Sequence, residues 1–327
     1  MMAMGSKTLQ EIDVYDRHND VRASIPVGIV SGDGPGPTLA IIGGVHGTEY
    51  AAHEGVIEFW QQLKPEAVRG EILVVLAADV VALTRRSAYL NPVDGKNLNR
   101  VWPGTKDGTL TDVIAQAISE RVIAPADAVI DVHGGEWDES IDLFIITHRT
   151  GEEDLDRRTV ELALAVGFPY VEVTDAGGPV LGVGTGSGTA MLGGTVAMTL
   201  EAGGEARRTR RHVAGVVNGL ENACRHMGLK RGSLTTWAGN PVLLDHGVLI
   251  KCEHSGVLRP AVKVGDWIEA GSVFTEVLDH DGTMLERVCV SEAGVVLDVI
   301  TARGIAGGFV GKIGVCPPRA TSSADER

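Results

Sequence analysis

The sequence predicts an α/β protein with a mostly parallel or mixed sheet covered by helices on both faces, followed by a small all-β domain. Up to about residue 230, continuous apolar segments alternate with segments of helical period. This alternation is typical of buried strands joined by crossover helices. From residue 232 on, short alternating segments and turn glycines replace the helical period. We therefore expect an α/β domain over residues 1–231, a β-barrel or sandwich-like appendage over residues 232–318, and a disordered tail over residues 319–327.

The expected elements follow a polar start in a regular order. The first strand breaks at a Gly-Gly pair, and Thr48 is a plausible N-cap for the helix that follows it. The later elements are assigned from apolar runs and from helical spacing. Strands are expected at 38–43, 70–83, 127–133 and 195–201, and helices at 48–63, 110–126, 155–168 and 210–229.

Composition narrows the range of partners. The net charge of −14 argues against nucleic acid or an anionic membrane surface. No stretch of 18 apolar residues suggests a membrane span, and the start of the chain has no apolar segment of the kind found in secretory signals. The four cysteines form no C-x-x-C pair, which predicts reduced thiols and a cytoplasmic location.

Three expected strands end in a residue that can bind a metal or exchange a proton. The strands end at His46, His133 and Glu201, and each then runs into glycine, where a ligand can approach the backbone closely. In an open α/β sheet, chemistry is found beyond the carboxyl ends of the strands. The sequence therefore predicts that these three residues meet in one site.

The residue types match a catalytic zinc site, which takes three ligands from His and Asp/Glu and leaves a position for water. His46 and Glu49 can face one ion, His133 can complete the set, and Glu201 would remain as a general base. Taken singly, each residue has an ordinary structural explanation, such as a turn histidine or a carboxylate at a helix start. His53 is the competing ligand, although its helical face favours a packed, hydrogen-bonded histidine, and Glu54 is expected to be solvated.

Four motifs in order resemble the succinylglutamate desuccinylase/aspartoacylase family over roughly residues 35 to 230: H-x-x-E at 46–49, NPVDGKNLNRVWPG at 91–104, DVHGGE at 131–136 and TLEAGG at 199–204. The resemblance implies a zinc carboxypeptidase-like fold in residues 1–231, one Zn²⁺ per subunit, and hydrolysis of the amide bond of a small N-acyl amino acid. It further implies that His46, Glu49 and His133 are the zinc ligands and that Glu201 is the general base.

The resemblance also implies that Asn99 and Arg100 hold the substrate carboxylate. A guanidinium can bind a carboxylate through two parallel hydrogen bonds, which suits an anionic group in an acidic protein. The family tends to have a further arginine upstream that polarises the scissile carbonyl. Arg85 and Arg86 are both candidates, and we favour Arg86 as the catalytic one, with Arg85 as a substrate-binding residue.

The chain departs from the family pattern at two places. Aspartoacylases read D-L-N-R where this chain reads N-L-N-R at 97–100, and Thr48 replaces the usual asparagine of H-G-N-E. These departures place it nearer the broader bacterial branch, which includes deacetylases of N-acetyl-diaminobutyrate, so neither N-acetylaspartate nor succinylglutamate is assumed as the substrate.

Two further stretches are given structural interpretations. The glycine-rich segment 181–194 does not satisfy a phosphate-loop pattern, and we expect a flexible loop that lines the pocket. The segment 255–274 resembles biotinyl and lipoyl carrier domains but lacks a lysine at the hairpin tip. The β appendage is expected to cap the site or to build an interface in a homo-oligomer.

Two alternatives remain open. A carboxypeptidase-like metallopeptidase would use the same zinc chemistry but would need a cleft that admits peptides. A non-catalytic zinc- or ligand-binding protein would have no need for Glu201.

Overall fold

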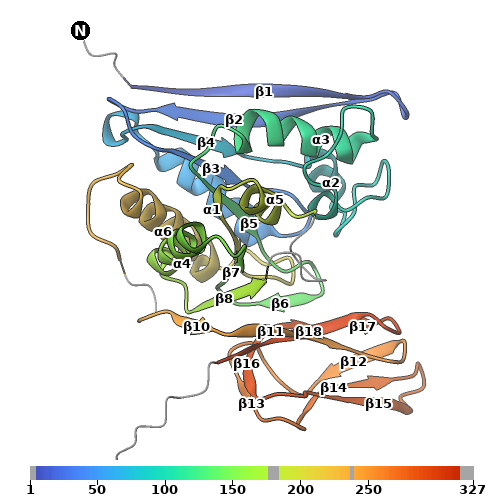
Figure 1. Ribbon diagram of the computed structural model, residues 1–327. Coiled ribbons are helices and arrows are strands. Elements are labelled where there is room, and N and C mark those ends of the chain that lie inside the picture. Colours follow the sequence, from blue (N-terminus) through green and yellow to red (C-terminus); the bar gives the residue numbers. More distant parts are fainter. Residues whose placement is uncertain (1–4, 176–183, 236–238, 317–327) are drawn as a thin grey trace, which may run out of the picture.

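A nine-stranded mixed sheet forms the centre of the protein, as the computed structural model shows for residues 5–175, 184–235 and 239–316 (Figure 1). In spatial order the strands are β1 (Ser6–Asp16), β2 (Val21–Ser31), β4 (Glu71–Val75), β3 (Thr38–Ile42), β5 (Ala128–His133), β9 (Val196–Glu201), β7 (Phe144–Arg149), β8 (Tyr170–Asp175) and β10 (Val242–Leu244). The four strands β4, β3, β5 and β9 are parallel, and β7 runs antiparallel to β9. The mixed α/β fold class predicted from the sequence is confirmed.

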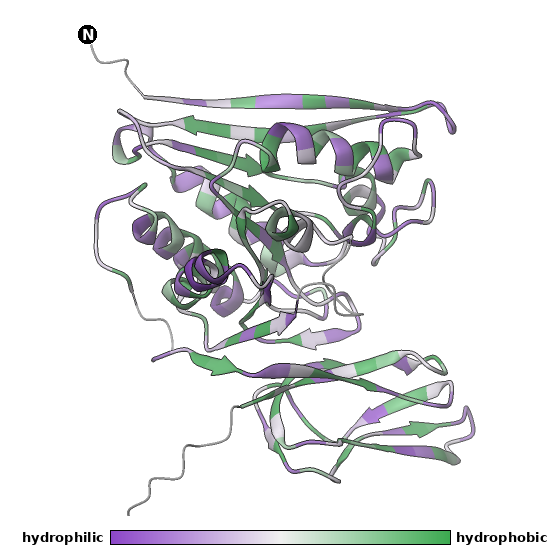
Figure 2. Cartoon of the chain, viewed as in Figure 1, coloured by the Kyte–Doolittle hydropathy of each residue, from purple (hydrophilic) through white to green (hydrophobic). Residues whose placement is uncertain are grey.

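Helices cover both faces of this sheet (Figure 1). On one face α1 (Tyr50–Gln62), α4 (Glu153–Val166) and α6 (Arg210–His226) enclose a core that includes the fully buried Phe59 and Phe168. On the other face α2 (Val80–Arg85), α3 (Leu110–Ile118) and α5 (Gly186–Leu192) contribute side chains to a second core. The central strands β3 and β5 are accordingly mostly apolar, as Figure 2 shows, because both of their faces are buried.

Several elements differ from the expectation. Residues 70–83 are not one strand, because Asp79 caps α2 by accepting a hydrogen bond from the amide of Ala82 at 2.8 Å. The start of the chain is not merely polar, since β1 and β2 form a long antiparallel hairpin at the sheet edge. Strands β7 and β8 were also not anticipated.

The glycine-rich segment 181–194 is a helix where the structure describes it. Thr185 caps α5, and the small residues that follow allow the helix to pack closely on β5. A Cβ atom at Gly186, for example, would lie 2.7 Å from Asp131 Oδ2. The expected loop is therefore wrong for residues 186–192, which form α5, and residues 181–183 of the segment lie outside the described residues.

The C-terminal strands form two sheets around their own core, which contains Phe274 and Val310. One sheet has β11 (His246–Lys251), β18 (Phe309–Val315), β16 (Gly294–Ile300) and β13 (Trp267–Ile268), and the other has β15 (Met284–Cys289), β14 (Val273–Leu278), β12 (Gly256–Pro260) and β17 (Arg303–Gly304).

The α/β unit, built on the large sheet, and the C-terminal unit, built on the two smaller sheets, are joined by strand pairing in both directions. The large sheet continues into β10, which pairs with β8, while β6 (Glu139–Ile141) leaves the α/β unit to pair with β16. The predicted boundary at residue 231 therefore does not separate the two sets of sheets, and the predicted tail lies outside the described residues. Among the described helices, none is long and apolar enough to cross a membrane.

Candidate active site

A cavity of about 460 Å³ opens where the carboxyl ends of β5 and β9 meet the C-terminal unit. The α/β unit contributes His46, Glu49, Asn99, Arg100, His133 and Glu201 to its walls. The C-terminal unit contributes residues of β16, β17 and β18. His46, His133 and Glu201 therefore meet at one cavity, although β3 ends at Ile42 and His46 lies in the turn before α1 rather than at the strand end. The outer wall of the cavity comes from the C-terminal unit.

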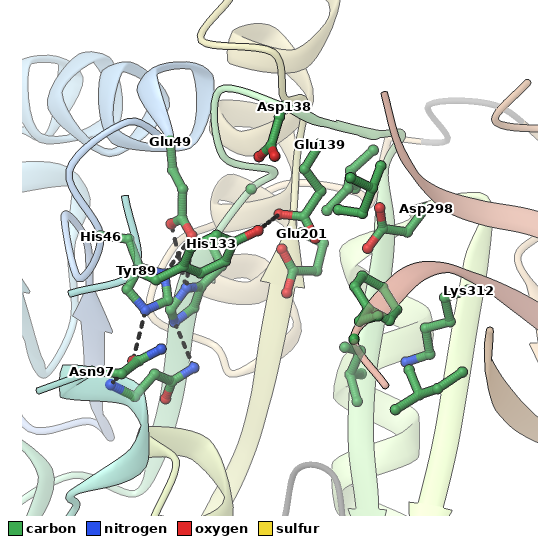
Figure 3. A pocket seen from close by; sticks show the side chains of 18 of the residues that line it. His46, Glu49, Tyr89, Asn97, His133, Asp138, Glu139, Glu201, Asp298 and Lys312 are labelled. Atoms are coloured by element: carbon green, nitrogen blue, oxygen red, sulfur yellow. Dashed lines mark hydrogen bonds and ion pairs between the residues drawn. The ribbon is translucent and has the colours of Figure 1, made fainter. Parts of the chain in front are cut away.

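His46, Glu49 and His133 form one buried cluster in this cavity (Figure 3). One ligand atom from each residue lies within 4.8 Å of the other two. His46 Nδ1 is 2.6 Å from Glu49 Oε1, and His133 Nδ1 is 3.3 Å from Glu49 Oε2. Thr48 does not cap α1 as expected. Glu49 occupies the cap position and points its carboxylate at the two rings.

The outward nitrogen of each ring is held by a polar side chain. His46 Nε2 lies 3.0 Å from Asn97 Oδ1, and His133 Nε2 lies 3.1 Å from Asp131 Oδ1. Outer polar contacts of this kind help to fix ring orientation in metal sites. Each ring therefore turns its Nδ1 toward Glu49.

Opposite charges attract one another within this cluster. Burial alone would raise the pKa of Glu49, but His46 and His133 lower it to about 2. Burial likewise lowers the pKa of both histidines, and their acidic neighbours more than reverse this, so that both pKa values are raised. The acidic neighbours of the two rings thus favour positive charge in this position.

Glu201 ends β9 directly opposite His133 on β5. Its carboxyl group faces the cavity and makes no hydrogen bond or ion pair with any described residue. Burial raises the pKa of Glu201 to about 8, and Glu49 and Glu139 add to the rise while His133 opposes it. This is the free carboxyl group that the sequence predicted beside the cluster.

Asn99 and Arg100 reach the cavity from the short 3-10 helix η2 (Leu98–Arg100). Asn99 Oδ1 accepts a hydrogen bond from the amide of Gly186 at 3.2 Å, and its Nδ2 lies 3.4 Å from His133 Nε2. Arg100 donates to the carbonyl of Asn99 at 2.6 Å and has no acidic partner among the described residues. Its guanidinium is therefore available for an anion.

The structure does not bring Arg85 or Arg86 to the site. Arg85 ends α2 and Arg86 caps it in the left-handed conformation, and both side chains are exposed and outside the cavity walls. The predicted catalytic role of Arg86 and the binding role of Arg85 therefore have no geometric support. His53 stands apart from the cluster, since its Nε2 lies 2.8 Å from the carbonyl of Leu76, and Glu54 pairs with Arg208 at the surface.

Several acidic residues of the site were not predicted. Glu136 is fully buried, accepts hydrogen bonds from the hydroxyl of Thr48 and from the amide of Tyr89, and lies 3.9 Å from His46 Nδ1. Burial raises the pKa of Glu136 to about 7, with Glu49 adding to the effect. Its place in the DVHGGE motif was a usable signal. Asp298 arrives from the C-terminal unit, and nothing in the sequence links it to the site.

The fold is that of the zinc carboxypeptidase-like deacylases. Residues 35–227 match the model of the succinylglutamate desuccinylase/aspartoacylase catalytic domain. The chain is 31% identical over 262 residues to the N-alpha-acetyl-L-2,4-diaminobutyric acid deacetylase of Halomonas elongata, covering 78% of this chain and 74% of the relative. This chain thus belongs to the succinylglutamate desuccinylase/aspartoacylase family.

Solved structures agree over almost the whole chain, including the C-terminal unit. The succinylglutamate desuccinylase/aspartoacylase of Rhodobacter sphaeroides superposes with a TM-score of 0.85 at 24% identity and 96% coverage of both chains. A succinylglutamate desuccinylase of a Silicibacter species gives a TM-score of 0.83 at 25% identity, with 96% and 95% coverage.

Proposed function

We propose that this protein is a zinc-dependent hydrolase that removes the acyl group from a small N-acyl amino acid. The observation that carries the proposal is the cluster of His46, Glu49 and His133 with the unpaired carboxyl group of Glu201 beside it. Family membership and the deacetylase relative support the reaction class.

The side chains present fit one zinc ion. Two imidazoles and a carboxylate are a common ligand set for catalytic zinc, and the described residues of the cavity walls include no cysteine. Glu49 Oε1 and Oε2 face the Nδ1 atoms of His46 and His133 at 2.6 Å and 3.3 Å, so one cation could meet all three side chains. A zinc ion held there would supply Lewis acidity and make water a nucleophile near neutral pH.

Substrate binding and proton transfer are carried out by side chains of the protein. Arg100 and the Asn99 amide hold the carboxylate of the amino acid, which orients the amide bond. Glu201 takes a proton from the attacking water and delivers it to the leaving amine. A divalent cation nearby would favour the ionised form of Glu201, which it needs in order to act as the base.

The C-terminal unit favours a deacylase over a peptidase. Residues of β16 to β18 wall the cavity, and a space of about 460 Å³ suits a small molecule better than an extended peptide. A catalytically silent binding protein is disfavoured because Glu201 is left unpaired and facing the cluster. A cytoplasmic location and a homo-oligomeric state remain predictions.

The experiment is a hydrolysis assay of the zinc-loaded protein against N-acetyl and N-succinyl amino acids, with short peptides in parallel. We expect release of free amino acid from at least one acyl amino acid, abolition by a chelator, and recovery with zinc. Activity confined to peptides would instead favour the carboxypeptidase, and zinc binding without any turnover would favour the silent binding protein.

A further inference from the structure

Tyr89 lies at the rim of the cavity beside the cluster of His46, Glu49 and His133, and the proposed function gives it no role. It lines the cavity and is 37% exposed. Its ring meets the ring of His46 in a T-shaped arrangement, with 6.1 Å between the two centroids. In Figure 3 its hydroxyl points toward Glu139. The phenol therefore spans from a proposed zinc ligand to a carboxyl group on another wall of the cavity.

The backbone of Tyr89 is held in a conformation that residues other than glycine rarely adopt. Its φ is 55°, in the left-handed region, which costs free energy for a residue with a side chain. The Tyr89 amide donates to Oε1 of the buried Glu136 at 2.6 Å, and the same oxygen lies 3.9 Å from His46 Nδ1. One carboxylate oxygen thus fixes the main chain of residue 89 close to the cluster. Strain that a buried group maintains beside a reactive site indicates that the position of this side chain matters there.

The hydroxyl of Tyr89 can be redirected to an incoming group at little cost. It donates to Glu139 Oε2 at 3.2 Å, which is long for a hydrogen bond between two oxygen atoms. Glu139 Oε2 also accepts the amide of Glu136 at 3.0 Å, so this oxygen remains hydrogen-bonded when the hydroxyl turns away. A phenol has a pKa of about 10 and keeps its proton near neutral pH. The hydroxyl is therefore a donor that a substrate can recruit.

The charged donors of the described cavity wall have other contacts or another task. The ammonium of Lys312 is 2.6 Å from Glu172, and both side chains are almost fully buried. Arg303 Nη2 lies 3.0 Å from His280 Nδ1. Arg100 is assigned to the carboxylate of the amino acid. This leaves the Tyr89 hydroxyl as the donor to be placed on the acyl group.

We propose that the Tyr89 hydroxyl donates a hydrogen bond to the acyl carbonyl oxygen of the substrate and stabilises the negative charge that forms on it. The inference rests on the proposed deacylase function and adds a catalytic residue to it. When water attacks, a carbon–oxygen bond forms and the π electrons of the carbonyl move onto its oxygen. Tyr89 keeps its proton and strengthens its hydrogen bond to that oxygen, while Glu201 takes a proton from the water. The electrons return as the carbon–nitrogen bond breaks, and the amine leaves with the proton from Glu201.

Tyr89→Phe removes the hydroxyl and keeps the ring beside His46. For the zinc-loaded protein, with the substrate of highest turnover among the N-acetyl and N-succinyl amino acids, we expect kcat to fall by about a hundredfold, as for other lost donors to an oxyanion. KM should change by less than about threefold, because a contact made only in the transition state lowers kcat and kcat/KM together. The zinc content should equal that of the wild type. Tyr15→Phe, which removes an exposed hydroxyl bonded to Asp20, is the matched control and should keep the wild-type kcat.

Binding of a transition-state analogue gives a second measure that does not depend on turnover. In the phosphonamidate analogue of the same substrate, a tetrahedral phosphorus carries a charged oxygen in place of the carbonyl oxygen. Calorimetric titration should show that Tyr89→Phe weakens the Kd of this analogue by about the factor lost in kcat and leaves the Kd of the product amino acid unchanged. Should Tyr89→Phe fail to fold, Tyr89→Asn serves the same test, because asparagine tolerates a positive φ and carries no hydroxyl.

The outcomes separate the inference from the proposed function. Wild-type kcat in Tyr89→Phe, or equal affinity of the wild type and this variant for the phosphonamidate, would overturn the catalytic role and leave the deacylase intact. A loss of kcat that comes with a loss of zinc or of product affinity would overturn it too, since the hydroxyl would then only support the structure of the site. Absence of hydrolysis by the wild type with every acyl amino acid would contradict the proposed function, and the inference with it.

Discussion

Asn97 holds the imidazole ring of His46 at the nitrogen that faces away from Glu49, because Asn97 Oδ1 lies 3.0 Å from His46 Nε2. The same oxygen accepts the amide of Asn99 at 2.7 Å, so the start of η2 and the orientation of a proposed zinc ligand depend on one side chain. Aspartoacylases have an aspartate at this position of the motif. The neutral amide here makes the imidazole less basic than a carboxylate would.

Asn97→Ala should therefore weaken zinc binding by about 10- to 100-fold, because the ring loses its orienting acceptor. Asn97→Asp should keep or tighten zinc binding, since a carboxylate in the same place makes the imidazole more basic. Competition with a chromogenic chelator measures both affinities. Equal affinity in wild type and Asn97→Ala would show that the hydrogen bond has no part in holding the ligand.

A ligand and a base should respond differently to replacement. His133→Ala should lose the metal, which elemental analysis of the purified protein measures. Glu201→Gln should retain zinc and lose on the order of a hundredfold or more in kcat, as expected for a missing proton shuttle. His53→Ala is the control for the first variant, since His53 bonds to a carbonyl away from the cluster. Zinc content unchanged in His133→Ala, or full turnover in Glu201→Gln, would refute the respective role.

The stability of the fold should depend on pH through His148 on β7, which is 2% exposed. Burial lowers the pKa of His148 to about 4, and Lys312 adds to the effect. In the unfolded chain His148 takes up a proton near pH 6.5, whereas in the folded chain it does so only at about pH 4. The free energy of unfolding should therefore decrease as the pH falls through this window, by about 3 kcal/mol in total.

His148→Gln should remove this contribution, so that the unfolding free energy changes less steeply between pH 6.5 and pH 4 by about 1.4 kcal/mol per pH unit. Urea unfolding at several pH values measures the slope. His254→Gln, at an exposed position, is the control and should unfold with the wild-type slope. A slope unaltered in His148→Gln would mean that His148 is protonated in the folded protein.

The buried ion pair of Lys312 and Glu172 ties β18 of the C-terminal unit to β8 of the large sheet. Its atoms are 2.6 Å apart, and the side chains are 6% and 3% exposed. Lys312→Met should lower the unfolding free energy by about 3–5 kcal/mol, because it leaves the Glu172 carboxylate buried without a partner.

Adding Glu172→Gln to Lys312→Met should recover much of this loss, since the orphaned charge is then removed. Lys106→Met, which breaks an exposed pair with Glu120, should change the unfolding free energy by about 0–1 kcal/mol. Denaturant unfolding measures all three. A similar small effect for Lys312→Met and Lys106→Met would show that water reaches the Lys312 pair.

The sequence by itself determined the α/β class, the placement of His133 and Glu201 at strand ends, and that of His46 in a strand-to-helix turn. These features are local: apolar runs define buried strands, and a parallel sheet brings the carboxyl ends of its strands to one edge. Glu49 was recoverable for the same reason, because it lies three residues from His46 on one turn.

Only the tertiary structure decided which side chains surround this group. Asn97 and Asp131 are recognised by their distances to ring nitrogens, and the exposure of Arg85 and Arg86 follows from where α2 ends. Asp298 reaches the cavity because β6 leaves the large unit to pair with β16, a contact between segments more than 150 residues apart. Pairing of that kind depends on the packing of two folded units, and no periodicity within either segment encodes it.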